Sequence, residues 1–116
     1  TADNWGPARI MSHLIDVEKL YRGRMQLILT QETPYLKSAN PAADGDDSAH
    51  VFRPELEAFA MERGETISLL MNLALKQWER TGIHDEYGEL SVEDIAERLI
   101  DHDNEHLAQI EAAFQQ

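Results

Sequence analysis

Three stretches of the chain carry apolar residues at steps of three and four, and this spacing limits the possible folds more than any other feature. Residues spaced in this way share one face of an α-helix, so each stretch predicts a helix with one buried side. The predicted helices cover about residues 7–30, 54–74 and 91–114. With 116 residues, the chain is predicted to form one all-α domain spanning residues 1–116.

Local signals mark where these helices begin. Pro7 and Pro54 stand at first-turn positions, where the missing N–H does no harm. Ser91, followed three residues later by Asp94, is typical of a capping box. The predicted buried faces are Ile10, Leu14, Val17, Tyr21, Met25 and Ile28; Leu56, Phe59, Ala60, Ile67, Leu70, Met71 and Ala74; and Val92, Ile95, Ala96, Leu99, Ile110 and Phe114. Arg63 falls on the second of these faces, and we expect its side chain to extend outward to water.

The segments between the helices differ in character. Residues 31–53 hold Pro34, Pro41 and an acidic run with Gly45, and they are too polar for a strand, so we predict a long irregular loop. Loops of this length in small domains are often functional or mobile. Residues 78–90 contain two glycines and predict an extended or turning connection.

The composition excludes several classes of function. The net charge of −12 argues against nucleic acid and against an anionic membrane surface as partners. The absence of Cys excludes disulfides, thiolate catalysis and Cys-type zinc sites. Neither a membrane-spanning apolar run nor a secretory leader is evident, so a cytoplasmic location is expected. The chain does not begin with Met, which suggests processing or a piece of a longer protein.

Three of the five histidines fall on predicted buried faces. His102 and His106 are one helical turn apart, between Leu99 and Ile110 in the apolar stripe of the third helix. His13 lies between Ile10 and Leu14 on the first helix. Two imidazoles at this spacing can bind one ion, although the same spacing also arises by chance in histidines that face solvent or pack in a core.

Three histidines with an open fourth position form a known layout for a catalytic metal. Imidazole ligands favour Zn, Ni, Cu or Fe over Mg and Ca. Nearby carboxylates could orient the imidazoles, and the candidates are Asp16, Asp103 and Glu105. The two other histidines are predicted outside the site: His50 at the surface of the long loop, and His84 in a turn, bonded to backbone.

Two segments resemble DinB-like (DinB/YfiT) proteins. The stretch W-G-P-A-R-I-M-S-H-L-I-D-V-E, Trp5 to Glu18, is similar to their Trp followed by a helix with His-Leu-x-Asp-x-Glu. Gly88 to Ile110 is similar to their C-terminal signature, a Gly-Glu-x-Ser/Thr helix start followed by His-Asp-x-x-His-x-x-Gln-Ile. The resemblance implies an up-and-down four-helix bundle with a metal, usually zinc or nickel, held by His13, His102 and His106.

The resemblance also implies activities and partners. Family members include thiol-dependent S-transferases, mycothiol-dependent isomerases and proteins without assigned activity, and homodimers are common. In the family a full helix precedes the Trp segment, and it is missing here, so the expected bundle lacks its first helix. Three amphipathic helices would leave an apolar groove exposed, and we expect a homodimer to fill it.

Several functions remain open at this point. A metal-dependent enzyme would act on a small-molecule substrate by hydrolysis, or by S-transfer with a low-molecular-weight thiol, because the chain has no Cys of its own. Alternatively, the bundle is a non-catalytic module that binds a metal or a partner. A third alternative is a pH-sensitive histidine core without metal.

Overall fold

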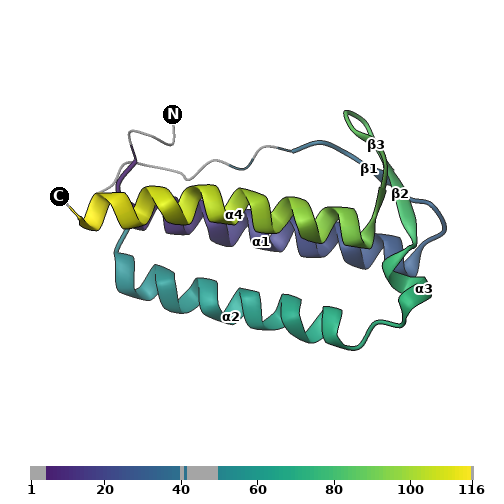
Figure 1. Cartoon of the computed structure of the whole chain (residues 1–116), viewed down its shortest axis with the longest axis horizontal. Coiled ribbons are helices and arrows are strands. Elements are labelled where there is room, and N and C mark those ends of the chain that lie inside the picture. Colours follow the sequence, from purple (N-terminus) through teal and green to yellow (C-terminus); the bar gives the residue numbers. More distant parts are fainter. Residues whose placement is uncertain (1–4, 40, 42–49, 116) are drawn as a thin grey trace.

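The computed structural model describes residues 5–39, 41 and 50–115. Three long helices dominate it, α1 (Pro7–Thr30), α2 (Phe52–Met71) and α4 (Val92–Phe114). A short helix, α3 (Leu75–Trp78), follows α2. Strands β1 (Tyr35–Leu36), β2 (Thr81–His84) and β3 (Gly88–Ser91) form a small sheet at one end of the helices (Figure 1). The three long helices are therefore confirmed, whereas the prediction of an all-α chain missed the sheet.

The helices do not alternate in direction along the chain. α1 and α2 run the same way and α4 runs back (Figure 1), so the predicted up-and-down order is wrong for the first pair. The length of the intervening segment makes this possible: roughly 15 extended residues can span about 50 Å, whereas the 24 residues of α1 rise only about 36 Å. The connection between β1 and α2 therefore joins opposite ends of the bundle, and the acidic run of the predicted loop lies outside the described residues.

The sheet joins three separate parts of the chain. β1 pairs in parallel with β2, and β2 pairs antiparallel with β3. The prediction that residues 31–53 hold no strand is therefore wrong at Tyr35–Leu36, where pairing with distant β2 supplies the backbone partners. Gly82 allows this close approach, because a Cβ there would lie 2.9 Å from the Pro34 carbonyl oxygen. Gly88, the first residue of β3 after the loop of residues 85–87, has φ +75°, a conformation that glycine adopts without strain.

Most of the core lies along the contact between α1 and α4. Two apolar clusters fill it, one near the start of α1 and one near the sheet. The predicted faces of both helices are largely confirmed, with buried side chains at Ile10, Leu14, Val17, Met25, Ile28, Val92, Ile95, Leu99 and Ile110. The predicted capping box is also confirmed, because the Ser91 hydroxyl accepts from the Asp94 N–H and the Asp94 carboxylate accepts from the Ser91 N–H.

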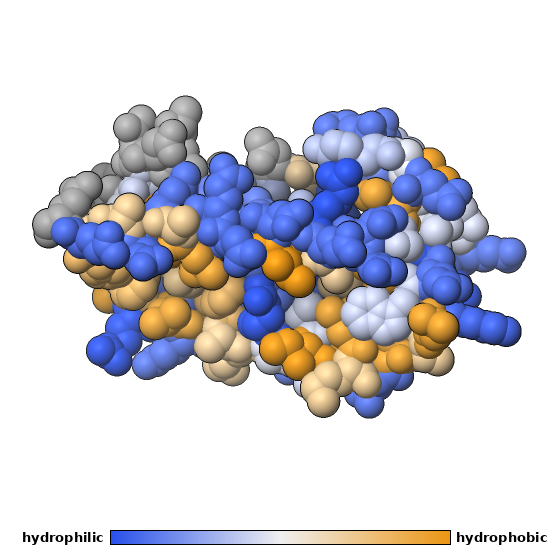
Figure 2. All heavy atoms as spheres, in the orientation of Figure 1, coloured by the Kyte–Doolittle hydropathy of each residue, from blue (hydrophilic) through white to orange (hydrophobic). Residues whose placement is uncertain are grey.

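α2 buries far less than its sequence predicted. It packs mainly against α1, and Thr66 is the one residue of α2 that is buried. The predicted apolar residues Leu56, Ile67 and Met71 remain exposed, and on α4 Phe114 is also exposed rather than buried. Figure 2 shows hydrophobic side chains gathered over α2 and between it and α4. Among the described helices, none is both long and apolar enough to cross a membrane.

Candidate metal centre

α1 and α4 bring the three predicted histidines together. One ring nitrogen from each of His13, His102 and His106 lies within 4.8 Å of the other two. The Nε2 atoms of His13 and His102 are 3.2 Å apart, although these residues are 89 positions apart in sequence. Among the described residues, no fourth His, Asp or Glu joins the group. The predicted grouping of the three side chains is thus present in the fold.

The three imidazoles differ in burial. His13 is only 7% exposed, and the edge of the Trp5 ring packs against it with centroids 5.4 Å apart. His102 and His106 are half-buried, so the cluster is reachable from solvent on the α4 side. Burial, followed by the positive charge that His102 and His106 can carry, lowers the pKa of His13 from 6.5 to about 4. At neutral pH the His13 ring is therefore neutral, as a metal ligand must be.

Hydrogen bonds fix the orientation of the two α4 imidazoles. Nδ1 of His102 lies 3.1 Å from Oδ1 of Asp103, and Nδ1 of His106 lies 2.9 Å from Oε1 of Gln109. Each oxygen accepts a hydrogen bond from the Nδ1–H group, so in the neutral rings both Nε2 atoms present lone pairs. Of the three predicted orienting carboxylates, Asp103 is buried against His102, whereas Asp16 and Glu105 are exposed.

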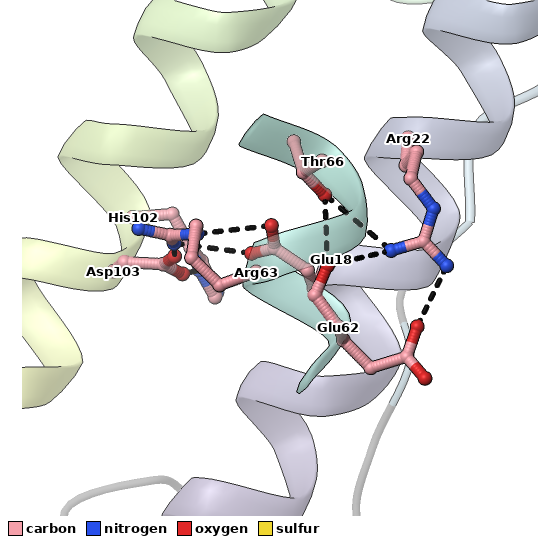
Figure 3. Close-up of polar contacts among 7 residues, drawn as sticks. All are labelled: Glu18, Arg22, Glu62, Arg63, Thr66, His102 and Asp103. Carbon is pink, nitrogen blue, oxygen red and sulfur yellow. Dashed lines mark hydrogen bonds and ion pairs between the residues drawn. The ribbon is translucent and has the colours of Figure 1, made fainter. Parts of the chain in front are cut away.

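A buried ion-pair network stands behind His102. Arg63 of α2 donates two hydrogen bonds to Glu18, at 2.9 and 3.0 Å, and a further one to Asp103 (Figure 3). The prediction that Arg63 extends outward to water is therefore wrong. Glu18 and Asp103 are 0% and 2% exposed, and their charges hold the guanidinium between the helices. Burial opposes the charged guanidinium, but Glu18 and then Asp103 outweigh it and raise the Arg63 pKa.

Two members of the site were missed from the sequence. Glu18 had a readable signal, because it occupies a position of the buried α1 stripe between Leu14 and Met25, where a carboxylate needs a partner. An arginine on the apolar face of another helix was the natural candidate. Gln109 had a signal only in the family resemblance, whose signature includes His-x-x-Gln-Ile, because glutamine three residues after a histidine is otherwise common on the surface of helices.

The arrangement of donors fits a transition metal. Two nitrogens that are 2.0–2.1 Å from a tetrahedral ion would be roughly 3.3 Å apart, close to the 3.2 Å between His13 and His102. Without an ion, the two Nε2 atoms can approach this closely only if one carries a proton and donates to the other. His13, His102 and His106 would hold the ion.

The two remaining histidines lie outside this cluster. The side chain of His50 is only 10% exposed and its Nδ1 lies 3.4 Å from Glu55 Oε1, so the predicted surface position is wrong. His84 is buried at the end of β2, where its Nδ1 accepts from the backbone N–H groups of Glu86 and Tyr87. The prediction that His84 is bonded to backbone is confirmed.

Comparison with known proteins identifies a similar fold and a family. The fold is similar to YfiT from Bacillus subtilis, described as "a probable metal-dependent hydrolase with an unusual four-helix bundle topology". The TM-score is 0.74 at 21% identity, over 93% of this chain and 64% of YfiT, so the chain spans less than two thirds of the length of YfiT. Among curated proteins none matches the sequence. The family model of the DinB superfamily matches residues 1–110, and the chain therefore belongs to the DinB superfamily.

Proposed function

We propose that the chain is a metal-dependent enzyme in which His13, His102 and His106 hold a divalent transition metal, zinc or nickel. The observation that carries this proposal is the convergence of three ring nitrogens within 4.8 Å, two of them with their proton-free atoms directed by Asp103 and Gln109. The description of YfiT as "a probable metal-dependent hydrolase" agrees with it.

The charge of the surrounding residues supports a cation at this position. Glu18 and Asp103 contribute two negative charges and Arg63 one positive charge, so the buried network carries a formal charge of −1. A dication beside His102 would meet a favourable field in an interior that screens charges weakly. The network also holds Asp103 in place, which in turn orients His102.

An open coordination position favours catalysis over a purely structural metal. Structural zinc sites usually have four protein ligands, whereas catalytic sites have three and an open position. When bound, the metal would lower the pKa of a water or thiol ligand and supply a nucleophile near neutral pH. Because the chain has no Cys, a thiol would come from a low-molecular-weight cosubstrate. The proposed reaction on a small-molecule substrate is hydrolysis with water, or S-transfer with the thiol.

Elemental analysis of protein purified without a metal-chelating step tests the proposal. We expect near-stoichiometric zinc or nickel, lost in His102→Ala and retained in His50→Ala, which removes a histidine outside the cluster. Metal-loaded protein would then be assayed for ester and amide hydrolysis and for transfer of small thiols to electrophiles. Equal metal content in the two variants would remove His102 from the site.

The alternatives predict other results. A non-catalytic metal-binding module would take up zinc or nickel with no open position, so added imidazole or azide would leave the spectrum of a cobalt-substituted protein unchanged. A histidine core without metal would give folded protein whose stability does not respond to zinc or nickel.

A further inference from the structure

A second feature lies directly beside the histidine cluster. A cavity of about 290 Å³ opens between the later part of α1 and the turn that joins β2 to β3. Tyr21 lines this cavity. The ring centroid of Tyr21 also lies 6.5 Å from that of His102, which connects the cavity wall to the histidine cluster. The remaining lining residues are Arg24, Ser38, Ala39, His84, Glu86 and Tyr87.

Arg24 supplies a positive charge to the cavity. Its guanidinium lies 5.4 Å from the centre of the Tyr21 ring and donates a hydrogen bond of 2.9 Å to the Lys37 carbonyl. Unlike Arg22 and Arg63, it forms no ion pair with a described residue. Since a guanidinium has five N–H groups, most of its donor capacity remains for a ligand.

His84 supplies a fixed hydrogen-bond donor. It is 4% exposed, stacks on Tyr87 with ring centroids 4.8 Å apart, and accepts two backbone N–H groups at Nδ1. The carboxylate of Asp85 lies 3.3 Å from the same Nδ1. In the neutral ring Nδ1 is the acceptor and Nε2 carries the proton, and in the protonated ring both nitrogens carry one. Nε2 is therefore a donor in either state.

We propose that this cavity binds a carboxylate group of the small molecule on which the histidine centre acts, an inference that rests on the proposed function. A planar guanidinium matches a carboxylate in a bidentate geometry, and the His84 Nε2–H would add a third donor. Exposed Glu86 at the cavity disfavours a group that concentrates two negative charges at one point, such as phosphate, more than a single carboxylate.

The spacing also limits the shape of the substrate. Along α1, Arg24 lies about 16 Å beyond His13, and helical side chains lean back toward the N-terminus. Arg24 accordingly reaches over Tyr21, toward the histidines. The reacting group and the carboxylate would thus be separated by a distance on the order of 10 Å, which indicates an elongated molecule with the carboxylate at the end away from the metal.

NMR titration of the full, ¹⁵N-labelled, metal-free chain tests this site without requiring activity. The probes are glutarate, its neutral diamide and inorganic phosphate. With glutarate we expect saturable shifts at the Glu86 and Tyr87 amides, which donate to His84. Arg24→Met should raise the dissociation constant by about tenfold or more. Arg53→Met, which removes an exposed arginine from the first turn of α2, should leave it unchanged.

Four results would each overturn the inference: no shifts at millimolar glutarate, equal affinity for the diamide, tighter binding of phosphate, or an unchanged dissociation constant in Arg24→Met. A separate zinc titration, followed at the ring C–H signals of His13, His102 and His106, tests the metal centre. Glutarate binding without zinc binding would refute the metal centre and retain the carboxylate site. Zinc binding without glutarate binding would refute the carboxylate site and retain the metal centre.

Discussion

The contact between α1 and α4 and the contact between α1 and α2 are built differently. α1 and α4 meet through fully buried apolar side chains such as Leu14, Met25 and Val92. α2 contributes one buried residue, Thr66, and partly buried apolar side chains such as Phe59 and Leu70. It is also linked to its neighbours by the guanidinium contacts of Arg63 and Arg22 (Figure 3). Hydrophobic burial is non-directional. These ion pairs, in contrast, form only when each helix has one rotation about its axis and one position along it. The second contact therefore fixes the site more than it fills the core.

The largest effect is expected at the ion-pair network. Arg63→Met would leave Glu18 and Asp103 buried without their cation, and should lower the free energy of unfolding by about 3–5 kcal/mol. The matched control is Arg22→Met, because its carboxylate partner Glu62 is 24% exposed whereas Glu18 and Asp103 are buried, and the expected loss is about 1 kcal/mol. Urea denaturation measures both. Equal losses would show that α2 is not held through Arg63.

A slightly smaller effect is expected in the apolar contact. Leu14→Ala should cost about 3 kcal/mol, because Leu14 is 0% exposed and its removal leaves a cavity between α1 and α4. Met61 on α2 is 74% exposed, and Met61→Ala should change stability by less than about 0.5 kcal/mol. If the two variants lose similar stability by the same denaturation measurement, the contrast between the two contacts is wrong.

The next effect concerns pH. The pKa of His13 falls from 6.5 to about 4 on folding because of burial and then of His102 and His106. The unfolded chain therefore binds more protons between these values, and the metal-free protein should lose about 2 kcal/mol of stability between pH 7 and pH 5. Asp85, whose pKa lies below 3.8 because of hydrogen bonds from Ser38, titrates outside this window. Thermal denaturation should show a weaker pH dependence in His13→Asn, and an unchanged one would contradict the assignment.

The smallest change in free energy per residue is expected from association through the exposed apolar side chains of α2 and α4. Those of Met71, Ile100 and Leu107 are among them, with Leu107 the least exposed at 40%. The sequence-based expectation of a homodimer remains a prediction, and light scattering at several concentrations tests it. A monodisperse monomer would contradict it, whereas a dimer weakened by Leu107→Glu would place the interface on this side of the molecule.

Much of this structure could be predicted from local patterns. The bounds of α1 and the inward positions of His13, His102 and His106 on their own helices follow from helical periodicity, and the capping box at Ser91 from a local motif, so each is readable within one segment. The family resemblance added the same ligand set from motifs at both ends of the chain.

The rest depends on partners that are distant in sequence. β1 is short and lies in a polar segment of the chain. It forms a strand because Gly82 lets β2 approach it. Arg63 resembles any helical arginine until Glu18 and Asp103 face it from two other helices. The parallel direction of α1 and α2 follows from a crossover whose path no local pattern specifies. Each of these features requires the tertiary fold before its cause can be identified.

The distribution of the histidines over α1 and α4 has a consequence for synthesis in the cell. His13 leaves the ribosome before His102, whose nitrogen is 89 residues later in the chain. Closing a loop of this length is entropically costly and belongs to the late, long-range steps of folding. A nascent chain therefore has no preformed three-histidine site until α4 has left the exit tunnel, so metal uptake would be largely post-translational and would mark chains that have completed folding.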